Sequence, residues 1–155
     1  MSTDSEQNRC SISIGDFEKS IEFLQEITNH TKGSLPYEAL LISALICYCR
    51  PFSRNERDKN ARAAPKIEFG SFLDITDDEK ALHEKCMTTR NKALAHSEWS
   101  SYPTAYKQET NVIVSRVYSI LSENIDLASL LALSKKLKEQ CHDRRADYTR
   151  CHRAS

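Results

Sequence analysis

The chain has 155 residues, of which 39% are hydrophobic and 28% charged, and its formal net charge is zero. This length suits one domain with a sizeable core, and the 3 glycines and 4 prolines are too few for a turn-rich β-sandwich or barrel. We therefore expect a single all-α domain over residues 1–155, without a glycine-rich phosphate loop because Gly15, Gly33 and Gly70 are far apart.

The first predicted helix begins near Ser13 or Asp16, after a polar segment, residues 1–11, that we expect to be flexible. Its apolar residues recur at helical spacing, with acidic and amide side chains between them. They are Phe17, Ile21, Leu24 and Ile27. Residues 29–34, with Gly33 as a stop signal, are predicted to end it.

The second predicted helix starts at the run Ser34-Leu35-Pro36-Tyr37-Glu38, which combines a capping serine, an early proline and an acidic first turn. It extends to about Cys49 and carries the broadest apolar surface of the chain, so we expect it to be the most buried helix. Pro51 is predicted to end it.

Residues 51–75 are predicted to be irregular, with a mobile polar loop over 53–64 and a return to the core through four apolar residues. These are Phe69, Phe72, Leu73 and Ile75. A third helix is predicted from Asp77 to His96, because Thr76 and Glu79 have the spacing of a capping box. Its inward stripe is Leu82, Cys86 and Ala93, with Leu94 beside it.

Residues 97–103 are predicted to be a loop, and residues 111–121 are ambiguous. The β-branched run 111–118 favours a short extended segment, but Ile113, Val117, Ile120 and Leu121 also keep helical spacing. We favour the extended segment, followed by a turn at 122–124. A final helix is predicted over 125–148, with residues 149–155 flexible.

The apolar pattern predicts no membrane span and the cysteine pattern predicts no metal site. The longest apolar-rich run, 39–49, is too short to cross a bilayer, and the N-terminus lacks the pattern of a signal peptide. We expect a cytoplasmic protein with reduced thiols and no cofactor. Cys47 and Cys49, and the adjacent pairs Cys141-His142 and Cys151-His152, lack the usual spacing of metal ligands.

Charge is unevenly distributed along the chain. Residues 50–66 carry six basic and two acidic side chains, and residues 134–155 carry seven and three. Both blocks could attract a polyanion. The interpretation we favour is a solvated basic loop and a solvated basic tail.

The run Thr89-Arg90-Asn91-Lys92-Ala93-Leu94-Ala95-His96-Ser97 places an arginine, an amide and a histidine close together near the end of the third predicted helix. Arginine is a permanent, planar donor suited to phosphate, and histidine transfers protons near neutral pH. Together these groups could cleave an RNA phosphodiester without a metal. Arg90, Asn91 and His96 are therefore the candidate catalytic residues.

Residues 82–97 resemble the signature helix of the HEPN superfamily (higher eukaryotes and prokaryotes nucleotide-binding), in particular an abortive-infection-like branch. That signature is an arginine, often followed by a polar residue, then four to six residues and a histidine. Here five residues separate Arg90 from His96, and Asn91 takes the polar place. The resemblance implies a HEPN-like bundle of four to five helices that forms a homodimer, in which the motif helices of two subunits face each other.

The resemblance also implies one of two functions. Catalytic HEPN members are metal-independent endoribonucleases, often toxins or antiviral defence effectors with an antitoxin or regulatory protein as partner. Other members are non-catalytic modules for dimerisation, protein-partner binding or nucleotide binding. We favour the endoribonuclease, with RNA as the substrate.

In the expected reaction the ribose 2′-hydroxyl attacks the adjacent phosphorus, leaving a 2′,3′-cyclic phosphate and a 5′-hydroxyl. His96 would transfer the proton, Arg90 would stabilise the charge on the phosphoryl oxygens, and Asn91 would orient the phosphate or His96. Six positions along a helix place Arg90 and His96 roughly 120° apart. A frayed helix end or a second subunit is therefore needed to complete the site.

Ordinary structural roles are open for the same residues. Arg90 could pair with Glu84 or another acid, Asn91 could bond locally, and His96 could favour the negative end of the helix dipole.

Four further residues are candidates for substrate binding: His83, Ser97, Trp99 and Tyr102. His83 lies nearly two full turns before Arg90 and could line the same cleft, although a solvated histidine is the interpretation we favour. Trp99 and Tyr102 could stack on a base, or could instead pack over the helix end.

Overall fold

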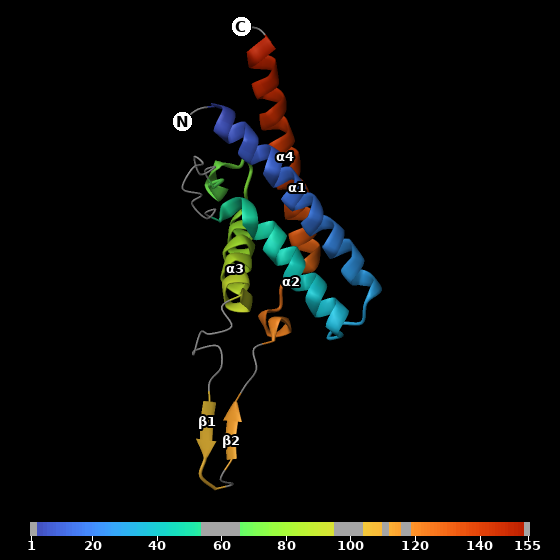
Figure 1. Ribbon diagram of the computed structural model, residues 1–155, viewed down its shortest axis with the longest axis vertical. Helices are drawn as coiled ribbons and strands as arrows, with labels where there is room; N and C mark the ends of the chain where they lie inside the picture. The colour runs from blue at the N-terminus through green and yellow to red at the C-terminus, as the bar shows by residue number, and fades with distance from the viewer. Residues whose placement is uncertain (1–2, 54–65, 95–103, 110–111, 116–118, 154–155) are drawn as a thin grey trace, which may run out of the picture.

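The computed structural model describes residues 3–53, 66–94, 104–109, 112–115 and 119–153. Its four α-helices are α1 (Thr3–Glu26), α2 (Leu35–Cys49), α3 (Asp77–Leu94) and α4 (Leu127–Arg153). In Figure 1, α1, α2 and α4 run beside one another, with α1 packed on both α2 and α4, and α3 lies against α2. The predicted all-α class and small helical bundle are confirmed.

Helix α1 begins at Thr3, about three turns earlier than predicted. Its early residues find partners at the end of α2, where the Arg9 Nη2 donates to the carbonyl oxygens of Arg50 at 2.6 Å and Pro51 at 2.7 Å. Arg9 and Cys10 are both buried. The polar composition of residues 1–11 could not reveal these distant acceptors, so the expected flexible start was wrong from Thr3 onward.

Helix α2 begins and ends as predicted. Ser34 caps it by accepting a hydrogen bond from the Tyr37 backbone N–H at 3.4 Å, and a short 3-10 helix, η2 (Arg50–Phe52), follows Cys49 at the proline. The turn before α2 contains Gly33 at φ +87°, a conformation that favours glycine. All nine positions from Leu41 to Cys49 are at least partly buried, as expected for the central helix.

Helix α3 begins with the predicted capping box. The Thr76 N–H donates to Glu79 Oε2 at 2.8 Å, and the Glu79 N–H donates to Thr76 Oγ1 at 3.2 Å. Glu79 also forms an ion pair with Lys136 of α4 at 2.9 Å. The capping box therefore sets the start of α3 and helps to fix α3 against α4.

Within the ambiguous region 111–121, residues 112–115 are extended, as favoured, whereas residues 120 and 121 begin a 3-10 helix. Strand β2 (Val112–Ser115) pairs antiparallel with β1 (Thr104–Lys107), a strand that we did not predict. The hairpin projects away from the helices in Figure 1. The predicted turn at 122–124 corresponds to the end of η5 (Ile120–Glu123), after which Asn124 adopts a left-handed conformation at φ 46°.

Helix α4 begins two residues later than predicted and continues to Arg153, so residues 149–153 are helical where we expected flexibility. Asp126 supports its start, since Oδ1 accepts from the Ala128 N–H at 3.0 Å and the Ser129 N–H at 3.2 Å.

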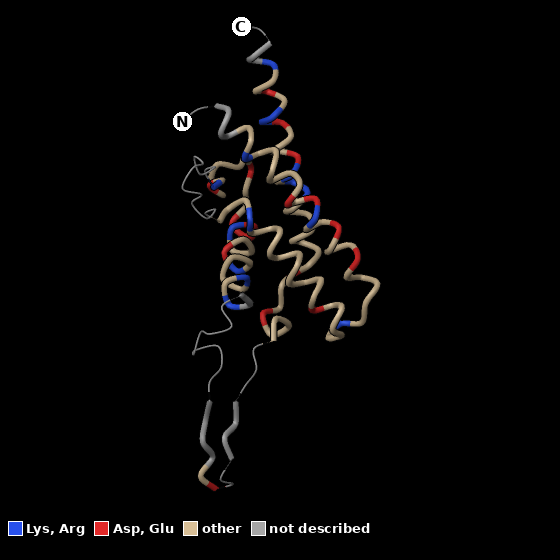
Figure 2. The backbone as a smooth tube through the Cα atoms, viewed as in Figure 1, with Lys and Arg blue, Asp and Glu red and all other residues tan. Residues whose placement is uncertain are grey.

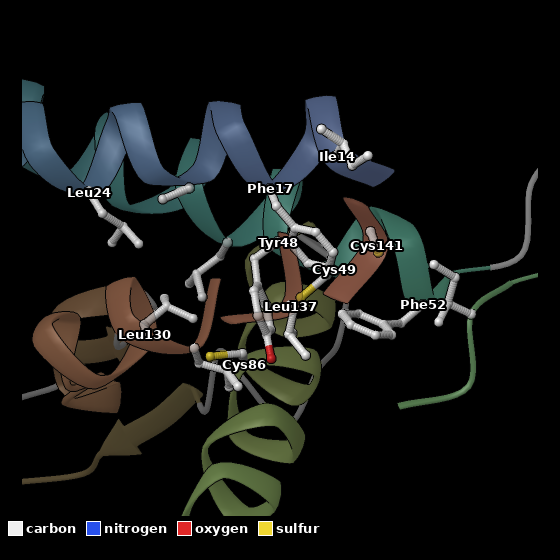
Figure 3. Packing of buried hydrophobic residues seen from close by; sticks show 14 of the residues in the cluster. Ile14, Phe17, Leu24, Tyr48, Cys49, Phe52, Cys86, Leu130, Leu137 and Cys141 are labelled. Carbon is white, nitrogen blue, oxygen red and sulfur yellow. The ribbon is translucent and has the colours of Figure 1, made fainter. Parts of the chain in front are cut away.

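The core lies between α1, α2, α3 and α4 (Figure 3). Its largest fully buried side chains include Phe17, Tyr48, Leu130 and Leu137. A short helix, η3 (Phe69–Ser71), returns the chain to the bundle before α3. Phe72 is buried, and Phe69 and Ile75 are partly buried, as predicted. The prediction that Leu73 contacts the core was wrong, because 70% of its surface is exposed.

The helices of the described ranges include none that is both long enough and apolar enough to cross a membrane. Basic and acidic residues are interleaved along these helices, most visibly along α3 and α4 (Figure 2).

Candidate functional site

Arg90 lies near the end of α3, where it connects that helix to the segment after α2. Its Nη1 donates to the Oδ1 of Asn91 at 2.9 Å, and its Nη2 donates to the hydroxyl oxygen of Ser53. The Arg90 side chain is half-buried, and Asn91 is exposed. Two of the three candidate catalytic residues are therefore in contact.

The charge of Arg90 is not balanced by a carboxylate among the described residues. The structure has no ion pair between Arg90 and Glu84, which the sequence left open. The partners of the guanidinium are two neutral oxygens and the Cys49 thiol. Its neighbour Lys92 differs, because it pairs with Glu123 at 3.2 Å. An unneutralised guanidinium keeps its attraction for an incoming anion such as a phosphate.

Ser53 is the residue that positions Arg90. Its hydroxyl donates to the Cys49 carbonyl oxygen at 2.8 Å while accepting from Arg90. Its backbone oxygen accepts from Arg9 Nη2 at 3.4 Å, so arginines from α1 and α3 meet at this one residue. Ser53 could not be found from the sequence, since a serine at the start of a polar loop is common.

The Cys49 thiol beside Arg90 is protonated at neutral pH. Burial raises the pKa of this thiol to about 12, and the nearby Arg90 charge only partly opposes the rise. Because the thiolate is the reactive form of cysteine, Cys49 acts as a packing residue and leaves the Arg90 charge unpaired.

His83 lies two turns before Arg90 and is held by aromatic residues. Its Nδ1 lies 3.0 Å from the Tyr48 hydroxyl, and its ring stacks on Phe69 with centroids 3.9 Å apart and an interplanar angle of 7°. The Phe52 ring is 4.6 Å from its centroid. The solvated histidine that we favoured from the sequence is therefore wrong, because the imidazole is packed against α2 and η3.

Burial fixes the protonation of this pair. It lowers the pKa of His83 to about 4, so the imidazole is neutral at pH 7, and it raises the pKa of the Tyr48 hydroxyl far above its ordinary value. Among the described residues, the acceptor for the buried Tyr48 hydroxyl is Nδ1 of His83. Because Tyr48 donates this hydrogen bond, the proton of the neutral imidazole is on Nε2.

His83 also lines an open pocket of about 620 Å³ between η3, the following loop and the first turns of α3. Its apolar wall is formed by Phe69, Phe72 and Ile75. The predicted role of His83 in substrate binding stays a prediction, now with a defined cavity beside the side chain.

Four predicted site residues, His96, Ser97, Trp99 and Tyr102, lie outside the described residues. Helix α3 is described as far as Leu94, two positions before His96. The convergence of Arg90 and His96 on one phosphate therefore stays a prediction. Arg90, Asn91 and Ser53 form the part of the candidate site that the structure defines.

Within the described residues no three His, Cys, Asp or Glu side chains are grouped to hold a metal ion. Cysteines are present on all four helices but are buried without disulfides: Cys10, Cys47, Cys49, Cys86 and Cys141.

No protein-family model matches the chain, and neither the curated proteins nor the solved structures include a match to it. The HEPN resemblance of residues 82–97 therefore depends on those residues alone. Chemically, the described part of the site supplies a positive, hydrogen-bonding group without a paired acid, which suits binding and stabilisation of a phosphate.

Proposed function

We propose that this chain is a metal-independent endoribonuclease of the HEPN type, acting in toxin or antiviral defence. The observation that carries the proposal is the Arg90 guanidinium, whose hydrogen-bond partners among the described residues, Asn91, Ser53 and the Cys49 thiol, are all uncharged. A buried carboxylate at this position would have cancelled the charge that a phosphorane needs. Arg90 keeps that charge and is held in place by Ser53.

In this proposal Arg90 binds a non-bridging phosphoryl oxygen and stabilises the charge that grows there as the ribose 2′-hydroxyl attacks. His96 transfers the proton between the 2′-hydroxyl and the leaving 5′-oxygen. Asn91, already bonded to Arg90 through Oδ1, keeps its amide N–H groups available to a second phosphate oxygen. The products are a 2′,3′-cyclic phosphate and a 5′-hydroxyl.

We further propose that the enzyme is a homodimer, because six helical positions separate the two catalytic side chains by roughly 120°. A second α3 would supply the missing histidine or arginine to each phosphate. Light scattering of the purified protein should give the mass of two chains, and a monomer active on RNA would contradict a shared site.

Cleavage of single-stranded RNA in excess chelator tests the proposed activity. The wild-type protein should release 2′,3′-cyclic phosphate ends and should leave DNA intact. Arg90→Ala should slow cleavage about 10²–10³-fold, and His96→Ala about 10²–10⁴-fold. Lys92→Ala is the matched control, since it removes a neighbouring cation that is already neutralised by Glu123. No cleavage by the wild type, or equal cleavage by all four proteins, would contradict the proposal.

The alternative is a non-catalytic HEPN module for dimerisation, protein-partner binding or nucleotide binding. The observation that favours it is that both terminal nitrogens of Arg90 hold protein groups, Ser53 and Asn91. Here Arg90→Ala would lower stability, and the wild-type protein would leave RNA uncut.

A further inference from the structure

The pocket beside His83 has a negatively charged rim. Asp74 and Glu84 line it, and neither carboxylate forms an ion pair with another described residue. Lys80 also lines the pocket, but its Nζ pairs with Asp77 at 2.9 Å. Among the charged residues that line the pocket, the two carboxylates form no ion pair and the one ammonium group is neutralised. Two further cations lie beside the pocket, since Lys136 donates to the Asp74 carbonyl oxygen and Arg144 lies over Phe72.

The wall of the pocket is aromatic. The Phe69 and Phe72 centroids are 6.4 Å apart, with the rings inclined at 54°. Aromatic rings attract cations over their faces, and arginine does so most readily because its planar group stacks while its edge donates hydrogen bonds. One ring of the wall already has such a contact, since the Arg144 guanidinium lies 4.5 Å from the centroid of the buried Phe72. Phe69, which is partly buried, is the ring of the wall that remains for an incoming cation.

His83 completes the wall without adding positive charge. The imidazole stacks on one face of Phe69, with Nδ1 committed to Tyr48. A charged histidine would repel a cation, whereas the neutral ring presents a flat, polarisable surface. The cavity of about 620 Å³ has room for a guanidinium and the side-chain stem that carries it.

We propose that this pocket binds an arginine side chain presented by a partner protein. The guanidinium would stack against Phe69 and donate to the carboxylates of Asp74 and Glu84. A nucleotide is the weaker candidate, because its phosphate would lie near two unpaired carboxylates. The proposal is independent of RNA cleavage, since no pocket residue other than His83 belongs to the candidate catalytic or substrate-binding set.

The pocket lies close to the candidate catalytic residues along α3. Seven positions separate His83 from Arg90, which places them about 10 Å apart along the axis and within about 20° around it. A protein that inserts an arginine beside His83 would therefore occupy the surface next to Arg90. Such a partner would be placed to control access of RNA to that residue.

Titration of the full-length protein with a blocked Gly-Arg-Gly peptide tests the proposal. The readout is the NMR signal of the His83 Cε1–H group, assigned by its loss in His83→Gln. Cation–π contacts and exposed ion pairs are individually weak, so we expect saturable binding with a Kd of about 1 mM. A peptide with citrulline in place of arginine keeps the shape and loses the charge, and should bind at least about fivefold more weakly.

The variant Asp74→Asn/Glu84→Gln should weaken binding of the arginine peptide about fivefold to tenfold. Glu18→Gln/Asp143→Asn is the matched control, because it removes two exposed carboxylates outside the pocket and should leave the Kd unchanged. Circular dichroism and thermal unfolding establish that each variant is folded.

Three results would overturn the proposal. The first is no shift of the His83 signal with the arginine peptide, and the second is equal affinity for arginine and citrulline. The third is a His83 shift produced by a short single-stranded RNA and not by the peptide, which would assign the pocket to a base. RNA cleavage is measured separately, so loss of one proposal leaves the other testable.

Discussion

Arg90 and His83 lie on nearly the same face of α3, and both are held by residues from the end of α2, yet their surroundings are opposite in character. Arg90 contacts polar, neutral oxygens and keeps a positive charge. His83 contacts aromatic rings and is neutral, beside two unpaired carboxylates. One helix face thus presents a positively charged end and a neutral, aromatic end beside two carboxylates.

The two ends depend on a common support, the Phe52 ring. Its centroid lies 5.7 Å from those of Tyr48 and Phe69, and Ser53, the acceptor for Arg90, is the next residue. A change at Phe52 should therefore disturb both ends, whereas changes at Arg90 or His83 should disturb one.

The largest expected effect is that of Phe52→Ala. The side chain is 7% exposed, and loss of a buried phenyl group should lower the free energy of unfolding by about 3–5 kcal/mol. Urea denaturation measures the change. Leu73→Ala, at a side chain that is 70% exposed, is the control and should change stability by less than about 0.5 kcal/mol. Similar losses for the two variants would show that Phe52 does not support the core.

The next largest effect is a pH dependence of the free energy of unfolding, which we expect from His83 and not from Arg90. The pKa of His83 is about 4 in the folded protein, below the value near 6.5 of an unfolded chain. Between these values the unfolded chain binds more protons, so the free energy of unfolding should fall as pH is lowered through this range. Because the side chain is partly exposed, we expect a loss of about 1–2 kcal/mol rather than the full value of the shift.

Urea denaturation of the wild type and of His83→Phe between about pH 4 and pH 7 isolates this contribution. The phenyl ring does not titrate, so the variant should lose that part of the pH dependence. His142→Gln on α4 removes a different histidine and should keep it. An identical pH profile for the wild type and His83→Phe would show that His83 is not held neutral.

A smaller effect tests the Arg90 end. Arg90→Met keeps much of the side-chain volume but removes the hydrogen bonds to Ser53 and Asn91, and should lower the free energy of unfolding by about 1 kcal/mol. Its pH dependence should follow that of the wild type. A loss as large as that of Phe52→Ala would mean that Arg90 is chiefly structural.

The smallest effect concerns the paired cation beside it. Lys92→Ala breaks a partly exposed ion pair with Glu123, which should contribute about 0.5 kcal/mol or less. The same denaturation experiment measures it. A larger loss than for Arg90→Met would reverse the order of importance that we assign to these two cations.

Local signals explain which parts of the fold could be predicted. Thr76 and Glu79 form the capping box that their spacing indicated, and Ser34 with Pro36 marks the start of α2, because both motifs are satisfied within four residues. The start of α1 could not be found in this way. Its support comes from contacts between Arg9 and residues 50–53, more than 40 positions away.

The same distinction applies to the candidate site. Arg90 and Asn91 were identified together because they are adjacent in one short motif whose side-chain types suit phosphate binding. The residues that orient the site come from a distant part of the chain, Tyr48 from α2 and Ser53 from the position after η2, and nothing in their own neighbourhoods distinguishes them. Composition likewise could not show that His83 is packed by Phe69 and Phe52, since a histidine followed by Glu84 and Lys85 resembles any solvated position.

The buried thiols on all four helices make the protein its own reporter of local opening. A thiol that is sealed from solvent reacts with an alkylating reagent only when its helix transiently detaches. Mass spectrometry of such reactions, resolved by cysteine, would rank the helices by how often each one leaves the bundle. Applied before and after a partner binds, the ranking would show which helix the partner holds in place.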